Sequence, residues 1–372
     1  MPGPILTFII FILVLGVIVI FHEIGHFFAA RRLGIKVEEF GIGFPPKIVG
    51  FKKKGTIYSI NWIPIGGFVK IKGEDGGHSA DKDSFISKSI AKRATVLSAG
   101  VIMNVVLAII LLSIGFGIGL PTLIDENIKN SNVRDQKVQI IDIEKGTPAS
   151  ETDLAVNDQI VKIDETTINS IEDVRSYNTD KIGQTVRVTV NRINKEMEFT
   201  VAVKDLDSTG AGKLGVNLVQ VGIVSYPWYD AIWRGFLTTF QLLWAIILAF
   251  VSLIKGLFVG QPIGDSLTGP IGIAVLTGQV AQLGFIYLLQ FTALLSLNLA
   301  IINFAPFPAL DGGRVLFLLI EKARKKRIPQ KTEALIHNLG FTLLMLLIIF
   351  ITFRDVRKFS GAITGFFKNI FS

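Results

Sequence analysis

The sequence predicts a polytopic α-helical membrane protein with four transmembrane helices, a membrane-associated β-hairpin and one inserted soluble α+β domain. Half of its 372 residues are hydrophobic, and many of them form unbroken runs long enough to cross a bilayer. Residues 121–227 differ, because short alternating segments typical of strands replace the apolar runs there. These observations indicate a multi-span membrane protein that carries some soluble mass.

The first span, residues 1–30, carries the most informative motif. Its apolar run is interrupted near the end by His22-Glu23-Ile24-Gly25-His26. Ionisable side chains are costly in lipid, so we expect these three to face protein or trapped water. On a helix His22 and His26 lie one turn apart on one face, which suits two nitrogen ligands of one zinc ion. Glu23 lies between them, where it can accept a proton from water. We interpret the motif as an intramembrane metal site.

A cleaved signal peptide and a chance match to the motif are both less well supported for this stretch. A signal peptide has a basic start and a small-residue cleavage site, and neither occurs around Met1-Pro2-Gly3-Pro4. A chance His-Glu-x-x-His match is common in soluble helices, but the cost of insertion acts against it inside a span. The chain has four histidines and no cysteine, so disulfides and thiolate ligands are excluded. Any metal must be held by His, Asp or Glu.

The loop at residues 31–93 is rich in Lys and Arg, which predicts that it lies on the cytoplasmic side. The first span therefore enters from outside, with its histidines toward the cytoplasm. The net charge of +8 follows from membrane topology, so we expect no nucleic-acid partner. Within the loop, Thr56 to Lys72 alternates like strands, with Pro64 and Gly66-Gly67 as the expected turn.

This segment predicts a β-hairpin apolar enough to dip into the membrane. Its edge at Gly66, Gly67 and Phe68 could pair with an extended peptide by strand addition. A plain surface hairpin is an equally supported alternative.

The second span, residues 94–120, contains Gly100 and Asn104 among apolar residues. The glycine could allow close helix packing, and the asparagine could form a hydrogen bond between helices. The third span and the motif that follows it occupy residues 284–320, and this span ends in Asn303 to Arg314. Two prolines there stop the helix, so Asp311 lies on irregular backbone at membrane depth, which is tolerated only where it lines a cavity.

The remaining segments complete the topology. Residues 321–334 form a basic loop of cytoplasmic type, residues 335–354 a fourth span, and residues 355–372 a tail. His337 is expected at the membrane interface rather than as a metal ligand. Residues 228–283 are apolar, but if they crossed the membrane Asp311 would lie on the face opposite His22. We therefore expect them in the interface, with both chain termini outside.

The inserted domain shows four expected strands and one short helix. These are Gln136 to Ile143, Gln159 to Ile163, Thr185 to Arg192, Glu196 to Val203, and the helix Ser170 to Ser176. The segment Lys145 to Ala149, followed by Leu154 and Asn157 to Ile163, resembles a PDZ domain of the bacterial protease type. That family usually has Gly-Asp and Asn-Gly where this chain has Asn157-Asp158 and Asp164-Glu165, so peptide binding by its groove stays open.

Together these motifs resemble the site-2 protease family of intramembrane metalloproteases, in particular its bacterial RseP-like branch. The match includes His22-Glu23-Ile24-Gly25-His26, Gly100 with Asn104, the Gly269-Pro270-Ile271-Gly272 turn, and N-x-x-P-x-P-x-L-D-G at Asn303 to Gly312. The resemblance implies His22, His26 and Asp311 as zinc ligands and Glu23 as the catalytic base. It also implies Asn104 and Asn303 near the substrate backbone.

The resemblance implies a metalloendopeptidase of the bacterial cytoplasmic membrane, with the PDZ domain on the extracytoplasmic side. Its expected substrates are single-span membrane proteins, such as an anti-sigma factor or a remnant signal peptide. A transporter and an inactive PDZ-bearing scaffold are the competing classes. The absence of paired inverted repeats weighs against the first, and the intact Glu23 weighs against the second.

Overall fold

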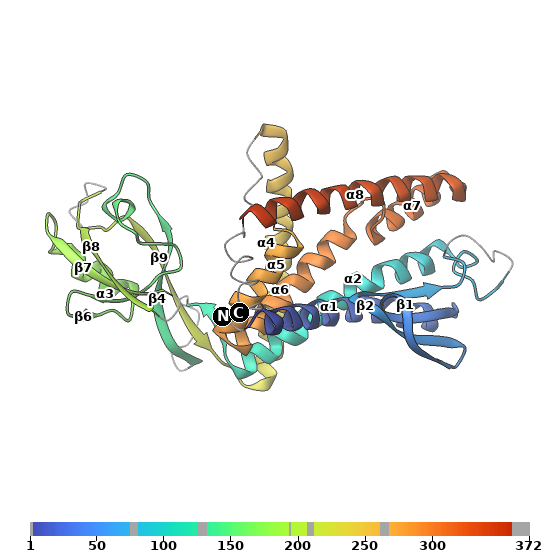
Figure 1. The fold of residues 1–372 in the computed structure, drawn as a ribbon, viewed down its shortest axis with the longest axis horizontal. Coiled ribbons are helices and arrows are strands. Elements are labelled where there is room, and N and C mark those ends of the chain that lie inside the picture. Colours follow the sequence, from blue (N-terminus) through green and yellow to red (C-terminus); the bar gives the residue numbers. More distant parts are fainter. Residues whose placement is uncertain are drawn as a thin grey trace. The chain divides into compact units, whose positions relative to one another are not determined.

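The computed structural model describes residues 3–74, 81–124, 132–192, 195–206, 212–260 and 268–358 (Figure 1). The chain forms two compact units. One consists of Met1–Ile114 and Ile232–Ser372, and the other of Gly115–Ala231. The first is mainly helical and the second mainly β.

The helical unit is built from seven helices in the described part of the chain. They are α1 (Pro4–Arg32), α2 (Ile90–Ile118), α4 (Trp228–Val259), α5 (Pro270–Leu283), α6 (Phe285–Phe304), α7 (Asp311–Arg324) and α8 (Gln330–Lys358), of which α2 and α4 continue into the second unit. By length and composition, five of them could cross a membrane, namely α1, α2, α4, α6 and α8. The expected count of four is therefore not confirmed, because the Trp228–Gly256 stretch also qualifies.

The ends of two helices differ from the expected boundaries. Helix α8 begins at Gln330 and continues to Lys358, so the first residues of the expected tail belong to this helix, and residues 359–372 lie outside the described part. Within the extension, the buried carboxylate of Asp355 accepts a hydrogen bond from the backbone N–H of Gly272 at 2.8 Å. This bond joins the end of α8 to the start of α5, which begins at Pro270 within the expected Gly-Pro turn.

The predicted hairpin is present, but the prediction that its turn lies at Pro64 and Gly66-Gly67 is wrong. Strand β1 (Val37–Lys53) pairs with β2 (Thr56–Ile71), and the two-residue turn between them is Lys54-Gly55. Both turn residues have positive φ angles, 48° and 83°, which is the backbone that the favoured hairpin turns require. Gly66, with φ of 97°, instead marks the point where β2 changes its pairing partners along β1.

The second unit is organised around one antiparallel sheet. Its strands are β3 (Leu120–Leu123), β4 (Val133–Ile143), β5 (Gln159–Ile163), β6 (Thr166–Thr167), β7 (Thr185–Arg192), β8 (Lys195–Ala202) and β9 (Val216–Val224), in the order β3-β9-β4-β5-β7-β8 with β6 beside β5. Helix α3 (Ile171–Thr179) begins at the cap Ser170, which exchanges hydrogen bonds with Asp173. The four expected strands and the short helix are thus confirmed.

Two departures from the usual PDZ pattern have a backbone cause. Asn157 and Asp164 occupy positive-φ positions, at 76° and 51°, where the related pattern places or adjoins glycine. Asn and Asp tolerate this conformation better than other side chains. The carboxylate of Asp164 accepts hydrogen bonds from the backbone N–H of Arg187 and the hydroxyl of Tyr177, which lowers its pKa.

Asp158 is the buried polar anchor of this unit. Its carboxylate is fully buried and accepts hydrogen bonds from Arg192 at 2.6 and 2.7 Å and from the backbone N–H of Ala155 at 2.9 Å. Replacing Asp158 by Ala leaves these donors unpaired, so we expect the second unit to lose about 3 kcal/mol of stability. Limited proteolysis of the full-length protein across a urea series measures this loss. Asp180→Ala, at an exposed position on α3's C-terminal cap, should leave the protease-sensitive midpoint unchanged.

Candidate metal centre

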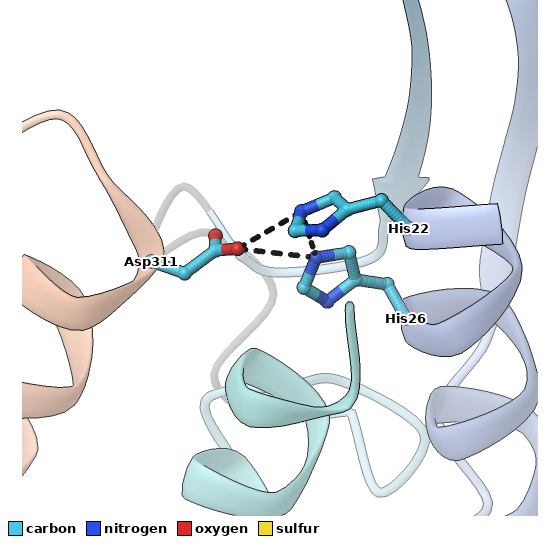
Figure 2. A group of neighbouring side chains, drawn as sticks. All are labelled: His22, His26 and Asp311. Carbon is cyan, nitrogen blue, oxygen red and sulfur yellow. Dashed lines mark hydrogen bonds and ion pairs between the residues drawn. The ribbon is translucent and has the colours of Figure 1, made fainter. Parts of the chain in front are cut away.

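Three side chains converge between α1 and α7 (Figure 2). His22 and His26 lie one turn apart near the end of α1, and Asp311 is the first residue of α7. The Nε2 atoms of the two histidines are 3.1 Å apart, and they lie 3.1 and 3.4 Å from Oδ2 of Asp311. Among the described residues, these three form the only cluster that could hold a metal ion.

The separations of these atoms fit a tetrahedral zinc ion. Zinc binds His nitrogen and carboxylate oxygen at about 2.0–2.2 Å, so neighbouring ligand atoms should lie roughly 3.3–3.5 Å apart. Both histidines are buried, and Oδ2 of Asp311 is a buried acceptor with no hydrogen-bond donor in the described structure. Each imidazole Nε2 has one lone pair or one proton, so three converging groups cannot satisfy one another by hydrogen bonds alone. A cation satisfies all of them, and the residue set therefore fits the metal.

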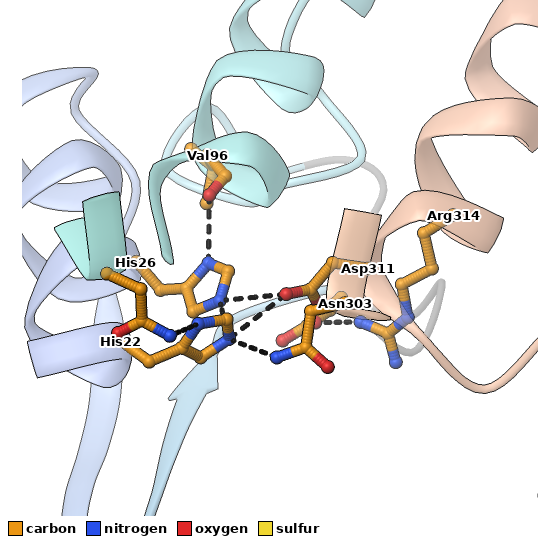
Figure 3. Close-up of polar contacts among 8 residues, drawn as sticks. His22, His26, Val96, Asn303, Asp311 and Arg314 are labelled. Carbon is orange, nitrogen blue, oxygen red and sulfur yellow. Dashed lines mark hydrogen bonds and ion pairs between the residues drawn. The ribbon is translucent and has the colours of Figure 1, made fainter. Parts of the chain in front are cut away.

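The second nitrogen of each histidine also has a neighbour (Figure 3). Nδ1–H of His26 donates to the backbone carbonyl of Val96 on α2 at 2.9 Å, which leaves its Nε2 lone pair free. Nδ1 of His22 lies 3.4 Å from the side-chain amide of Asn104, which is fully buried on the same helix α2. Helix α2 thus orients both rings of the motif, and sequence reasoning missed the Val96 carbonyl because a backbone acceptor has no residue-type signal.

Asn303 reaches the same centre from the last turn of α6. Its amide nitrogen lies 3.5 Å from Nε2 of His22, and the residue is partly exposed, whereas Asn104 is fully buried. The structure therefore brings both predicted asparagines to the metal centre but gives them different surroundings. Asn104 faces the back of one ring, and Asn303 stands at the accessible side.

Strand β2 lies beside Glu23. A methyl group built on Gly67 would lie 3.4 Å from Cγ of Glu23, and the backbone of Val69 is a hydrogen-bond partner of this carboxylate. The ring of Phe68 covers Gly41 on β1, and Gly66 lies against the ring of Phe44. Of the three expected edge residues, Gly67 is the one that lies against Glu23, while Gly66 and Phe68 contact β1.

Helix α7 is held in place by contacts that the sequence did not reveal. Arg314, one turn after Asp311 (Figure 3), forms an ion pair with Glu74, which follows β2. Gly312 lies against the backbone of Phe304, where a Cβ would be 2.2 Å from the carbonyl oxygen. The position of Asp311 therefore depends on both the hairpin and the end of α6. The only sequence signal for Arg314 was its place directly after the Asp-Gly-Gly motif.

Gly100 on α2 has no room for a side chain. A Cβ at this position would lie 2.4 Å from Nε2 of His26 and 2.8 Å from Nε2 of His22. Gly100→Ala should push the rings off their positions and weaken metal affinity at least about tenfold, as measured by competition with a metal chelator. Gly16→Ala on α1 is the matched control, because nothing lies within 4 Å of the added methyl. Equal metal affinity in both variants would contradict the contact.

A separate cavity of about 360 Å³ lies in the second unit between α3 and β9. Its lining includes Val174 and Asn178 from α3 and Val216 to Leu218 from β9.

The model of peptidase family M50 matches residues 10–347 of the chain. The protein belongs to this family. Membership confirms the resemblance drawn from the sequence motifs and the expectation of a peptidase, and it covers the His-Glu-x-x-His motif as well as the segment with Asp311. The apolar helices identify this M50 peptidase as a multi-pass membrane protein.

Several relatives match nearly the whole length of this M50 peptidase. A protein of Campylobacter jejuni is 32% identical and the match covers 96% of this chain and 95% of the relative. The zinc metalloprotease RasP of Oceanobacillus iheyensis is 30% identical, with 95% and 99% covered. The regulator of sigma-W protease RasP of Bacillus subtilis is 30% identical, with 95% and 98% covered.

Among solved structures, the PDZ domain of an SdrC-like protein from Listeria monocytogenes is similar to 22% of this chain. It is 23% identical, 85% of that domain is covered, and the TM-score is 0.21.

Proposed function

We propose that the protein is an intramembrane zinc endopeptidase that hydrolyses peptide bonds in the transmembrane segments of single-span membrane proteins. The convergence of His22, His26 and Asp311 within a unit of apolar helices carries this proposal. The names of the relatives as zinc metalloproteases support the choice of metal. All three donors are of types that zinc accepts, and three protein ligands leave a fourth position open for water.

The roles of the residues follow from their positions. His22, His26 and Asp311 would hold the ion, which when bound supplies Lewis acidity and lowers the pKa of water toward neutrality. Glu23, on the same turn of α1 as the histidines, accepts the proton of the attacking water and passes it to the leaving amine. Asn104 positions His22, because a metal-binding His needs a partner for its other nitrogen.

Substrate handling falls to Asn303 and the edge of the hairpin. A transmembrane helix hides its scissile carbonyls in its own hydrogen bonds, so the substrate must unwind, and the freed groups need partners in lipid. Asn303 is partly exposed beside the three converging donors, and Gly67 and the backbone of Val69 lie next to Glu23. We infer that an extended segment of substrate lies along this strand by β-addition.

The test of this function uses the purified full-length protein in detergent. It should contain about one zinc per chain and cleave a helical model substrate within its apolar segment, as located by mass spectrometry. A transporter would bind no stoichiometric zinc and cleave nothing. An inactive scaffold would hold zinc without cleavage, so each outcome separates the three classes.

We further propose that the protein crosses the bacterial cytoplasmic membrane four times and that α4 lies in the interface. Both histidines and Asp311 must meet on one side, and the basic loop before α8 favours the cytoplasm. In Figure 1, α4 runs across the direction of α1 and α8. Its Trp233 and Trp244 are exposed, and tryptophan prefers the membrane interface.

Cysteine labelling tests the topology, because the natural chain contains no cysteine. Single cysteines replace Glu172 in α3, Thr268 before α5 and Gln330 at the start of α8. With four spans, the first two should react with an impermeant thiol reagent added outside intact cells and the third should not. Labelling of Glu172→Cys and Thr268→Cys from opposite sides would show that α4 crosses the bilayer and would overturn this arrangement.

The proposed substrate class rests on the name of one relative and on the need for a single apolar span as substrate. The Bacillus relative is named a regulator of sigma-W protease, which suits a membrane-bound anti-sigma factor as substrate. A remnant signal peptide has the same form, a single apolar span freed of its outer domain. In this arrangement the second unit lies outside the cell, where it meets the trimmed end of such substrates.

A further inference from the structure

We propose that His337 is a positioning residue that holds the loop carrying Asp311. The proposal rests on the proposed role of Asp311 as the third metal ligand. His337 lies on α8, two turns from its start, and the sequence indicated only an interfacial place for it. In the structure its side chain contacts the segment 305–310 that joins α6 to α7.

The joining segment has few hydrogen bonds of its own. Pro306 and Pro308 have no backbone N–H, and the N–H groups of Phe307 and Leu310 bond within the segment, to the carbonyls of Ala305 and Phe307. The N–H of Ala309 has its acceptor on α8, where it donates to Nδ1 of His337 at 2.9 Å. This bond therefore ties the middle of the segment to another helix.

Ala309 needs such support because its backbone is unfavourable. Its φ angle is 81°, in the left-handed region that non-glycine residues avoid at a cost of about 1–3 kcal/mol. Strained positions persist where the surroundings hold them. The His337 ring supplies this restraint, since an amide can only donate and Nδ1 must therefore accept, with the ring proton on Nε2.

A second contact on the same face of α8 fixes the direction of the segment. Gly340, one turn after His337, lies so close to Pro308 that an added Cβ would be 2.5 Å from its Cβ and 2.6 Å from its carbonyl oxygen. The His337 ring also packs on Phe317 of α7, with ring centroids 5.3 Å apart. Helix α8 thus contacts both the segment that precedes Asp311 and helix α7, which begins with Asp311.

Asp311 follows Ala309 by two residues, so any shift of the segment moves the carboxylate. Its Oδ2 lies 3.1 and 3.4 Å from the two imidazole nitrogens. Metal sites and catalytic sites lose affinity and rate when a ligand is displaced by a fraction of an ångström. Position 337 therefore requires a hydrogen-bond acceptor at the place of Nδ1, and an aromatic ring without that acceptor is not sufficient.

Two variants separate the acceptor from the ring. In His337→Asn, the side-chain Oδ1 lies close to the former place of Nδ1 and still accepts the hydrogen bond from Ala309. In His337→Phe, the new ring still packs on Phe317 but offers no hydrogen-bond acceptor. His337→Gln extends its amide to the Nε2 position and should behave like the Phe variant. Leu339→Ala, at an exposed neighbouring position of α8, is the matched control.

The experiment loads full-length protein with Co²⁺ and records its visible absorption, its affinity for Co²⁺, and kcat and KM for a helical substrate. We expect His337→Phe to change the spectrum, weaken Co²⁺ binding about tenfold and lower kcat with little change in KM, while His337→Asn restores all three. Wild-type behaviour of the Phe variant, or equal losses in the Asn and Phe variants, would overturn the proposal. If the Phe variant fails to fold, the comparison of Gln with Asn decides in the same way. A wild-type protein that binds no Co²⁺ would instead overturn the metal site itself.

Discussion

Replacing Glu23 by Gln is expected to lower the rate of peptide hydrolysis by about a hundredfold to ten-thousandfold while the metal stays bound. A positioned general base contributes this much to proton transfer, and the neutral amide cannot accept a proton at neutral pH. Gln keeps the size of the side chain, and His22, His26 and Asp311 remain in place. Rates measured with a helical model substrate, together with zinc content by mass spectrometry, check both parts of the prediction.

The control for this variant is Glu172→Gln, which makes the same chemical change at α3, in the second unit. It should cleave at the wild-type rate. Near wild-type cleavage by Glu23→Gln would mean that another group activates the water. Loss of zinc from this variant would mean that Glu23 is itself a ligand, in conflict with the geometry of the three converging donors.

Replacing Asp311 by Ala is expected to lower the zinc content from about one per chain to near zero and to abolish cleavage. Two histidines without the carboxylate leave an incomplete set of protein ligands, since zinc sites of this kind use three. A ligand present at a thousand times its dissociation constant stabilises the folded state by about 4 kcal/mol. The variant should therefore lose the rise in melting temperature that added zinc produces in the wild-type protein.

The matched control is Asp180→Ala, an exposed acidic residue in the second unit. Its zinc content, activity and zinc-dependent melting temperature should equal those of the wild-type protein. In zinc-free buffer, the Asp311 variant should melt near the temperature of the wild-type protein treated with a chelator, which separates metal loss from misfolding. Full zinc occupancy in the Asp311 variant would remove this residue from the ligand set.

Much of the candidate site could be predicted from the sequence because its signals are local. The spacing of His22, Glu23 and His26 within an apolar run follows from helix periodicity and the cost of charge in lipid. The place of Asp311 followed from prolines that end a helix at membrane depth. The strands and the capped helix of the second unit also follow from local patterns, because alternation and a Ser-x-x-Asp start are properties of short segments.

The turn of the hairpin shows where local reasoning failed. Pro64, Gly66 and Gly67 carry stronger turn signals by composition than Lys54-Gly55, yet the chain turns at the latter. The choice depends on which residues of β1 lie opposite β2, and pairing between strands is not a property of either strand alone. In the same way, length and composition cannot decide whether α4 crosses the membrane, because its direction is set by packing against other helices.

By itself, the sequence determined the class of the protein, the two halves of its metal motif and the residue types able to do the chemistry. Only the tertiary structure decided that Asp311 meets His22 and His26, that Gly100 leaves space for both rings, and that His337 and Gly340 hold the segment between α6 and α7. The physical reason is distance along the chain. Hydrophobic periodicity and helix ends are encoded within a few neighbouring residues, whereas a hydrogen bond from Ala309 to α8 exists only once separate helices pack together.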